Sequence, residues 1–147
     1  MLAVLPLARA MHEESPRFRG LTFDEGQTRR TAEFLMQLDG GFLLVAEHGG
    51  TLVGLLAALR TRHFFSAEQY VSELAVYVAP SARGGLLAVR MVRELERWAL
   101  AGGARECILG VSTEVNVVRT GQLYERLGYR RSGVTYIKDL SSEQPGS

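Results

Sequence analysis

The sequence has little cysteine and histidine, and neither sign of charge is in clear excess. Cys107 is its single cysteine, which excludes a disulfide within this sequence and a cysteine-rich zinc site. The three histidines, His12, His48 and His63, lack the spacing of metal ligands, so we expect no bound metal. The net charge is +1, with 17 basic and 16 acidic residues. No overall field therefore favours nucleic acid or an anionic membrane.

Long hydrophobic runs are also missing. No stretch reaches the length of a membrane span, and the apolar segment at residues 2–8 lacks the basic leader and cleavage site of a signal peptide. We therefore expect a cytoplasmic protein without membrane association. The 147 residues can form one domain with a substantial core, which we place at residues 1–140. The polar stretch 141–147 has the composition of a disordered tail.

Apolar periodicity and glycine-rich breaks predict the helices and strands. Helices are expected at about 3–14, 24–38, 85–101 and 117–127. Strands are expected at 42–47, 51–59, 70–78, 106–111 and about 129–138, the first two joined by a glycine turn into an antiparallel hairpin. This order predicts an α/β fold, with a mixed sheet covered by helices on both faces.

The segment from Tyr70 to Ala88 is the most informative part of the chain. A strand ends at a proline, and a short turn then carries Arg83, Gly84 and Gly85 into a long amphipathic helix. The unpaired N–H groups and positive dipole end of a helix N-terminus attract anions, and glycine lets an anion approach the backbone. Arginine adds donors that suit phosphate. The segment thus predicts a phosphorylated cofactor, with a plain glycine turn beside a surface arginine as the equal alternative.

Two motifs resemble those of the GNAT superfamily of N-acetyltransferases, and the likeness covers about residues 1–140. The hexapeptide Arg-Gly-Gly-Leu-Leu-Ala at 83–88 is similar to the family's acyl-CoA loop, with leucine at its central glycine. The heptapeptide Leu-Tyr-Glu-Arg-Leu-Gly-Tyr at 123–129 is similar to the motif that ends the family's fourth helix. The resemblance implies the GNAT fold, acetyl-CoA as co-substrate, and direct transfer of its acetyl group to a primary amine of a small molecule or peptide.

Two departures from the family's pattern concern the site and the sheet. The family often has an asparagine seven residues before its tyrosine, but Val117 occupies that place here. The chain also opens on a predicted helix, whereas the family begins with a strand, so the first strand is missing or shortened. A shortened sheet, or a neighbouring subunit in a homodimer, would account for the exposed edge.

The resemblance also implies where acetyl-CoA binds. The pantetheine arm would pair with the main chain of the strand at 70–78 as an added strand does. The pyrophosphate would lie on the N–H groups that open the following helix, with the arginine beside it. The cofactor-binding residues implied in this way are Val76, Tyr77, Val78, Arg83, Gly84, Gly85, Leu86, Leu87 and Ala88.

Two side chains are candidates for catalysis. Tyr124 matches the family tyrosine that gives a proton to the departing thiolate; alternatively, it is an aromatic residue packed at a helix end. Glu73 is the candidate general base; alternatively, it is a strand-end glutamate paired with an arginine. Strict alternation places Glu73 on the same strand face as Val71 and Tyr77, and a bulge, common in this strand of the family, would change that. A main-chain N–H of the strand would meet the oxyanion.

Fewer sequence features indicate where the acceptor amine binds. Glu13 and Glu14 end the first predicted helix, where the helix dipole disfavours acids, and acidic residues suit a cationic amine. The alternative, which is the more usual one for two exposed carboxylates at a helix end, is that both are simply solvated. The leading function is therefore an acetyl-CoA-dependent N-acetyltransferase. The alternatives are a non-catalytic acyl-CoA sensor or regulatory module and an interaction protein with an arginine-rich surface, the latter disfavoured by the balanced charge.

Overall fold

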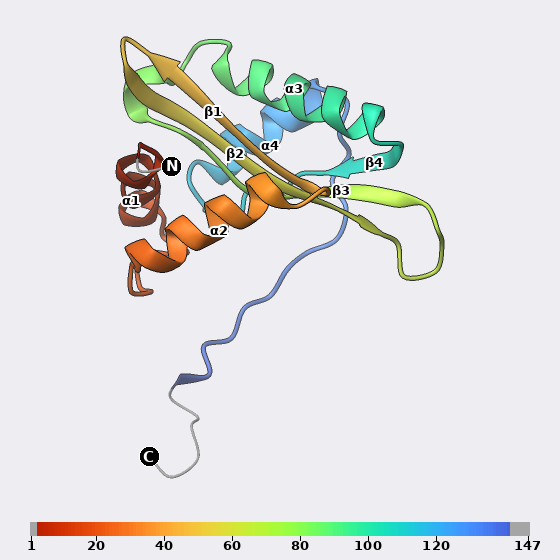
Figure 1. The fold of residues 1–147 in the computed structure, drawn as a ribbon, viewed down its shortest axis with the longest axis horizontal. Coiled ribbons are helices and arrows are strands. Elements are labelled where there is room, and N and C mark those ends of the chain that lie inside the picture. Colours follow the sequence, from red (N-terminus) through yellow and green to blue (C-terminus); the bar gives the residue numbers. More distant parts are fainter. Residues whose placement is uncertain (1–2, 142–147) are drawn as a thin grey trace.

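The computed structural model describes residues 3–141 (Figure 1). Its helices are α1 Val4–Glu14, α2 Glu25–Gln37, α3 Leu87–Ala101 and α4 Val117–Arg126, with a 3-10 turn at Pro80–Ala82. Its strands are β1 Gly41–His48, β2 Thr51–Arg62, β3 Gln69–Val78 and β4 Ala104–Ile108. No helix among the described residues is both long and apolar enough to cross a membrane.

The four strands form one mixed sheet in the order β1-β2-β3-β4. The first three are antiparallel, and β4 lies parallel to β3. Gly49 and Gly50 both have positive φ, which the tight turn between β1 and β2 requires. No strand precedes α1 within residues 3–141, so β1 is an edge of the sheet, as the missing first strand predicted.

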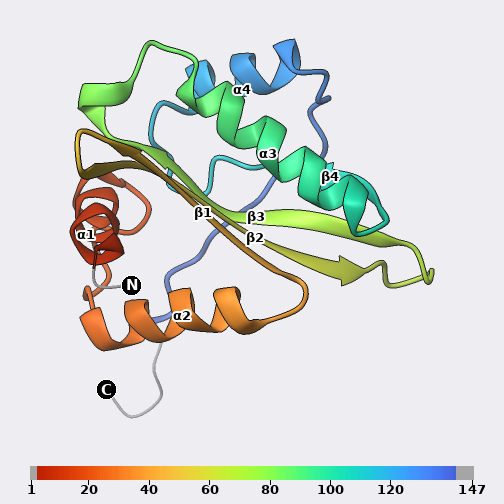
Figure 2. The same cartoon turned by 45° about the horizontal axis from the view of Figure 1, so that its top comes forward.

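Helices cover both faces of the sheet, as predicted. Figure 2 shows α3 and α4 on one face and α1 and α2 on the other. Leu56, Val71 and Leu95 belong to the core under α3, whereas Leu7 and Tyr77 belong to the core under α1. The Asp24 carboxylate caps α2 by accepting the Gln27 N–H at 2.9 Å, which explains why this helix begins there.

A bulge interrupts β3 at its centre. Ala57 of β2 pairs with Ala75, but Ala58 pairs with Glu73, so Leu74 has no partner across the ladder. The extra residue reverses the alternation, and Val71 and Tyr77 consequently face opposite sides of the sheet. The prediction that these two residues share a face is wrong for this reason.

The bulge also marks the point where β3 and β4 separate. Pairing between them extends only from Gln69 to Ser72 on β3. The strand expected at 106–111 accordingly ends at Ile108, because its partner turns away. The remainder of β3, from the bulge to Val78, has an open edge on the β4 side.

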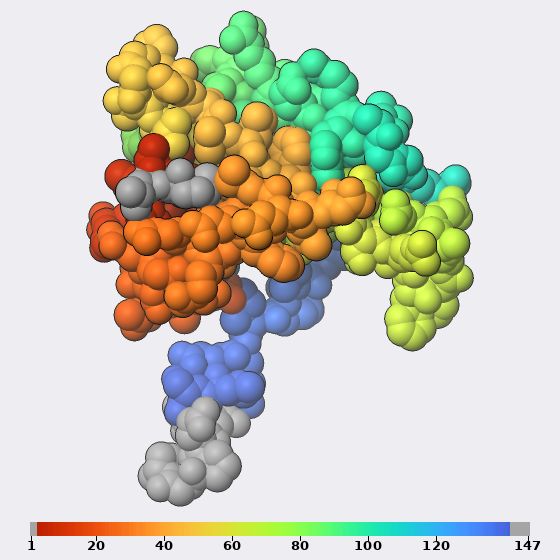
Figure 3. Space-filling model, viewed as in Figure 1, coloured from red at the N-terminus to blue at the C-terminus, as the bar shows by residue number. Residues whose placement is uncertain are grey.

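The last strand expected at about 129–138 is wrong. Residues 130–141, which we call the C-terminal arm, extend away from the body (Figures 1 and 3) and no strand is assigned in them. The alternating apolar residues suggested a strand, but a strand needs a partner edge, and the arm has none among the described residues. Val134, Tyr136, Ile137 and Leu140 are exposed there. The disordered tail expected at 141–147 lies, apart from Ser141, outside the described residues.

Candidate active site

The open edge of β3 presents backbone groups to the gap between the two strands. The carbonyls of Leu74 and Val78 accept hydrogen bonds from side chains on that side. Backbone groups point to alternate sides along a strand, so the N–H and C=O of Val76 face the gap as well. Those of Tyr77 point toward β2 instead. Of the three backbone positions expected to meet pantetheine, Val76 thus faces the gap with both groups, and Val78 faces it with a carbonyl already bonded to Arg83.

The N-terminus of α3 lies beyond the end of β3. Gly84 has φ of +88°, a conformation that favours glycine, and turns the chain into the helix. The helix ladder begins where Arg90 N–H donates to Leu86 O at 3.0 Å, so the amides of Leu87 and Ala88 lie outside it. A Cβ added at Gly84 or Gly85 would meet nothing within 4 Å, so the approach to the loop is open. This donor set fits a pyrophosphate.

Arg83 is directed away from that loop. Its Nε donates to Val78 O at 2.8 Å, and its two terminal nitrogens donate to the Glu14 carboxylate at 2.8 and 2.7 Å. Tyr77 OH also donates to Glu14, at 2.7 Å. The Arg83 guanidinium accordingly holds the pKa of Glu14 below its usual range. The pair joins the end of α1 to the turn after β3.

Glu73 lies at the point where β3 and β4 separate. Its side chain is almost wholly buried, and its Oε1 accepts the N–H of Gly110 at 3.2 Å. Ser112 Oγ lies 3.3 Å from Oε2. Burial raises the pKa of this carboxyl to about 7, although both hydrogen bonds favour the charged form. A glutamate with such a pKa can take up and release a proton near neutrality. The alternative of a pair with an arginine is not what the structure shows.

Tyr124 reaches the same place from α4. Its ring is buried, and its hydroxyl donates to Gly110 O at 2.9 Å. Burial, and then the nearby Glu73, raise the pKa of the phenol, so it keeps its proton at neutral pH. Gly110 therefore lies between the two candidates, since it donates to Glu73 and accepts from Tyr124. One candidate proton acceptor and one candidate donor meet at the head of the gap.

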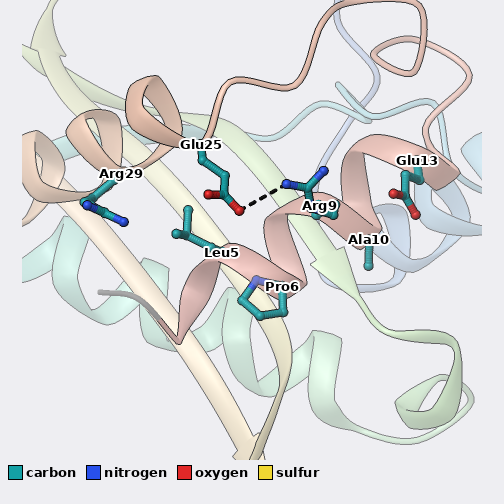
Figure 4. Close-up of a pocket in the computed structure, with 7 residues that line it drawn as sticks. All are labelled: Leu5, Pro6, Arg9, Ala10, Glu13, Glu25 and Arg29. Atoms are coloured by element: carbon teal, nitrogen blue, oxygen red, sulfur yellow. Dashed lines mark hydrogen bonds and ion pairs between the residues drawn. The ribbon is translucent and has the colours of Figure 1, made fainter.

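The two acids expected to bind the acceptor lie apart. Glu14 is held by Arg83 and Tyr77, as described above. Glu13 lies on an outer groove between α1 and α2 (Figure 4), whose charged residues also include Arg9, Glu25 and Arg29. In that groove Arg9 pairs with Glu25 at 3.1 Å. The structure thus does not bring Glu13 and Glu14 together at the gap.

Three hydrogen-bonding residues were not among the residues predicted from the sequence. Gly110 and Ser112 bind the glutamate, and Ser15, which is fully buried, donates to Thr113 O at 2.5 Å. These contacts join segments separated by 37 to 98 residues, and no local sequence pattern predicts them. Among the described residues, no group of three His, Cys, Asp or Glu could hold a metal ion.

Solved structures with the same fold include several acetyltransferases. An aminoglycoside acetyltransferase from an uncultured soil metagenomic sample is 22% identical, with a TM-score of 0.72, and the match covers 95% of this chain and 92% of that one. A transcriptional regulator from Bacillus halodurans C-125 is 17% identical, with a TM-score of 0.79 and 95% of each chain covered. The aminoglycoside N-acetyltransferase AAC(6')-Iy, in complex with CoA, is 17% identical, with a TM-score of 0.69 and 94% and 89% covered.

Comparison with curated proteins gave no match. The model of the acetyltransferase (GNAT) family matches residues 7–129, a span that includes both motifs, the separated strands and the two residues that meet at Gly110. With most of its length matched in this way, the chain belongs to the GNAT family of acetyltransferases.

Proposed function

We propose that the protein transfers the acetyl group of acetyl-CoA directly to a primary amine. The observation that carries this proposal is the meeting of Glu73 and Tyr124 at Gly110, where β3 leaves β4. The thioester would lie along the open edge of β3, and the pyrophosphate would lie on the amides of residues 84–88. A neighbour of the same fold was solved with CoA, which supports this choice of co-substrate.

Each residue has one task in the proposed reaction. Glu73 takes a proton from the ammonium form of the acceptor, directly or through water, and frees the amine nitrogen to attack the thioester carbon. The Val76 N–H donates to the carbonyl oxygen as its negative charge develops. Tyr124 then turns its hydrogen from Gly110 O to the departing sulfur. A C–N bond forms and the C–S bond breaks. The second proton, which the nitrogen loses as the amide forms, passes to the Tyr124 phenolate, and Glu73 releases the first proton to solvent.

Steady-state thiol release tests the proposal. Purified protein is mixed with acetyl-CoA and a panel of primary amines, with reactions lacking amine as the blank. We expect Tyr124→Phe to lower kcat by about 10²-fold or more, since general acid catalysis contributes on that order. Tyr136→Phe, the same change on the arm, is the matched control and should leave the rate unchanged.

Two outcomes would contradict the proposal at different points. Wild-type turnover by Tyr124→Phe would remove the tyrosine from the mechanism. Acetyl-CoA binding by calorimetry without thiol release for any amine would indicate instead the acyl-CoA sensor or regulatory module, which keeps the fold and lacks turnover.

We also propose that the protein works in the cytoplasm as a homodimer. A single free thiol, Cys107, is compatible with a reducing compartment. The open edge of β1 and the exposed apolar side chains of the arm provide surfaces that a second copy can cover.

A further inference from the structure

A second cavity lies on the sheet face that α1 and α2 cover. Its volume is about 400 Å³, and the sheet forms its floor while the two helices and the loop between them form its walls. The side chains that give it its character are Met11, Phe18, Leu35, Leu55 and Leu74. No charged residue and no histidine lines it among the described residues. The cavity is therefore apolar.

The cavity ends at the bulge of β3. Leu74 and Ala75 both line it, and Ser112 Oγ, which lies 3.3 Å from the Glu73 carboxylate, donates to Leu74 O at 3.0 Å. A molecule bound there would thus have one end at the point where the open edge of β3 begins. The loop wall is held firmly, because buried Ser15 accepts the Phe18 N–H at 3.0 Å and itself donates to Thr113 O.

The polar residues of the cavity wall provide no carboxylate for an acceptor that carries a second ammonium group. They are Gln27, Thr28 and Thr31 of α2. The two threonine hydroxyls donate to carbonyls of their own helix, at Asp24 and Gln27. The two nearest acids of α1 do not line the cavity either, because Glu14 is bound to Arg83 and Glu13 lies on the outer groove. An additional ammonium group in this space would have no carboxylate partner.

We propose that the acceptor is a primary monoamine with an apolar body, such as an alkylamine or arylalkylamine, which lies in this cavity with its nitrogen at the bulge. This inference rests on the proposed acetyl transfer. It sets the chain apart from neighbours of the same fold that are named for aminoglycosides, which carry several amino groups. The alkyl or aryl part would bind by burial of apolar surface and the single nitrogen would meet Glu73.

A chain-length series measures this preference. We expect kcat/KM for propylamine, butylamine, pentylamine and hexylamine to rise about three- to fourfold per methylene, as burial of one CH₂ group predicts. 2-Phenylethylamine should exceed ethylamine by at least about tenfold. Spermidine and kanamycin, which carry several cations, should be the poorest acceptors in the panel.

A charge placed in the cavity wall provides the structural control. Thr31→Asp should flatten the chain-length dependence and improve spermidine relative to hexylamine, because it supplies the missing carboxylate. Thr51→Asp makes the same change at the exposed start of β2 and should alter neither. Unchanged acetyl-CoA affinity would establish that both variants are folded.

The outcomes separate this inference from the proposed function. Acetylation of amines with no dependence on chain length, or with polycations preferred, would overturn the apolar acceptor and leave acetyl transfer intact. The same dependence in Thr31→Asp as in the wild type would place the acceptor outside this cavity. Thiol release with none of the amines would overturn the proposed function and this inference with it.

Discussion

The side chain of Glu73 determines how the protein responds to pH. Its pKa in the folded state is about 7, above the value of 4.5 that an exposed glutamate has. Between these two values the folded protein holds a proton that the unfolded chain releases. The contribution of this carboxyl to the free energy of unfolding is therefore greatest below pH 4.5, and that contribution is lost as the pH rises through 7.

A pH–rate profile tests the role of this group. If Glu73 is the base, kcat/KM should rise about tenfold per pH unit below pH 7 and level off above it, because only the carboxylate accepts a proton. Glu73→Gln should lack this limb and be slower by about 10²-fold or more. Glu125→Gln, on the exposed side of α4, should retain the limb. A Glu73→Gln profile that follows the wild type would assign the limb to another group.

Glu73→Gln should lower the rate of reaction but raise the stability of the folded protein. Glu73→Gln removes the buried charge present above pH 7, so it should resist urea better than the wild type at pH 8 and show a smaller advantage at pH 5. A difference between the two proteins that does not change with pH would show that the carboxyl titrates alike in the folded and unfolded chains.

The elements are connected at the site by contacts that no single element contains. Arg83 and Glu14 are 69 residues apart in the chain, and they join α1 to the turn between β3 and α3. The arginine was expected to contact phosphate, and its observed geometry suggests instead that it holds the turn in place. The two roles predict different effects on acetyl-CoA binding when the Glu14 carboxylate is removed.

Paired variants distinguish these roles. If the arginine acts by holding the turn, Arg83→Ala and Glu14→Gln should weaken acetyl-CoA binding to a similar extent, by about 1–3 kcal/mol for a charge-assisted contact. Calorimetry with acetyl-CoA measures both. Arg97→Ala breaks the exposed pair with Glu94 on α3 and should have no effect. Loss of binding in Arg83→Ala alone would establish a direct contact with phosphate.

Sequence patterns predicted those elements whose signals are local. The glycine turn of the β1–β2 hairpin, the Asp24 cap of α2 and the apolar stripe of α3 each lie within a few residues and agree with the structure. The bulge of β3, the end of β4 and the partner of Arg83 depend on segments far away in the chain. Strand pairing decided them, and no local pattern contains that information.

For the candidate site, the sequence supplied the residue types and the structure supplied their neighbours. Tyr124 and Glu73 were chosen from a motif and a strand position, and the structure places both at Gly110. No sequence pattern predicted the cavity beside the bulge, because its lining residues come from five helices and strands and from the loop between α1 and α2. Its apolar residues are indistinguishable in sequence from those of a filled core.

The C-terminal arm projects from the body of the molecule (Figure 3). Its apolar side chains are exposed, with Tyr136 at 90%. Because a monomer gains nothing from such exposure, we expect the arm to be buried between two copies. Light scattering after size exclusion should find the full chain as a dimer and a chain ending at Arg131 as a monomer.

A variant of unchanged length serves as the control for that truncation. Replacing Val134, Tyr136 and Ile137 together by serine should also give the monomer, since the apolar contacts, and not the length, hold the copies together. A full chain that is monomeric at every concentration measured would contradict the role given to the arm.

The arm also carries Lys138, the one lysine of the sequence. An acetyltransferase with this sequence consequently offers a single lysine side chain to reactive thioesters. The sheet, its bulge and the cavity likewise carry no lysine, so reagents that react with lysine side chains would leave them unlabelled.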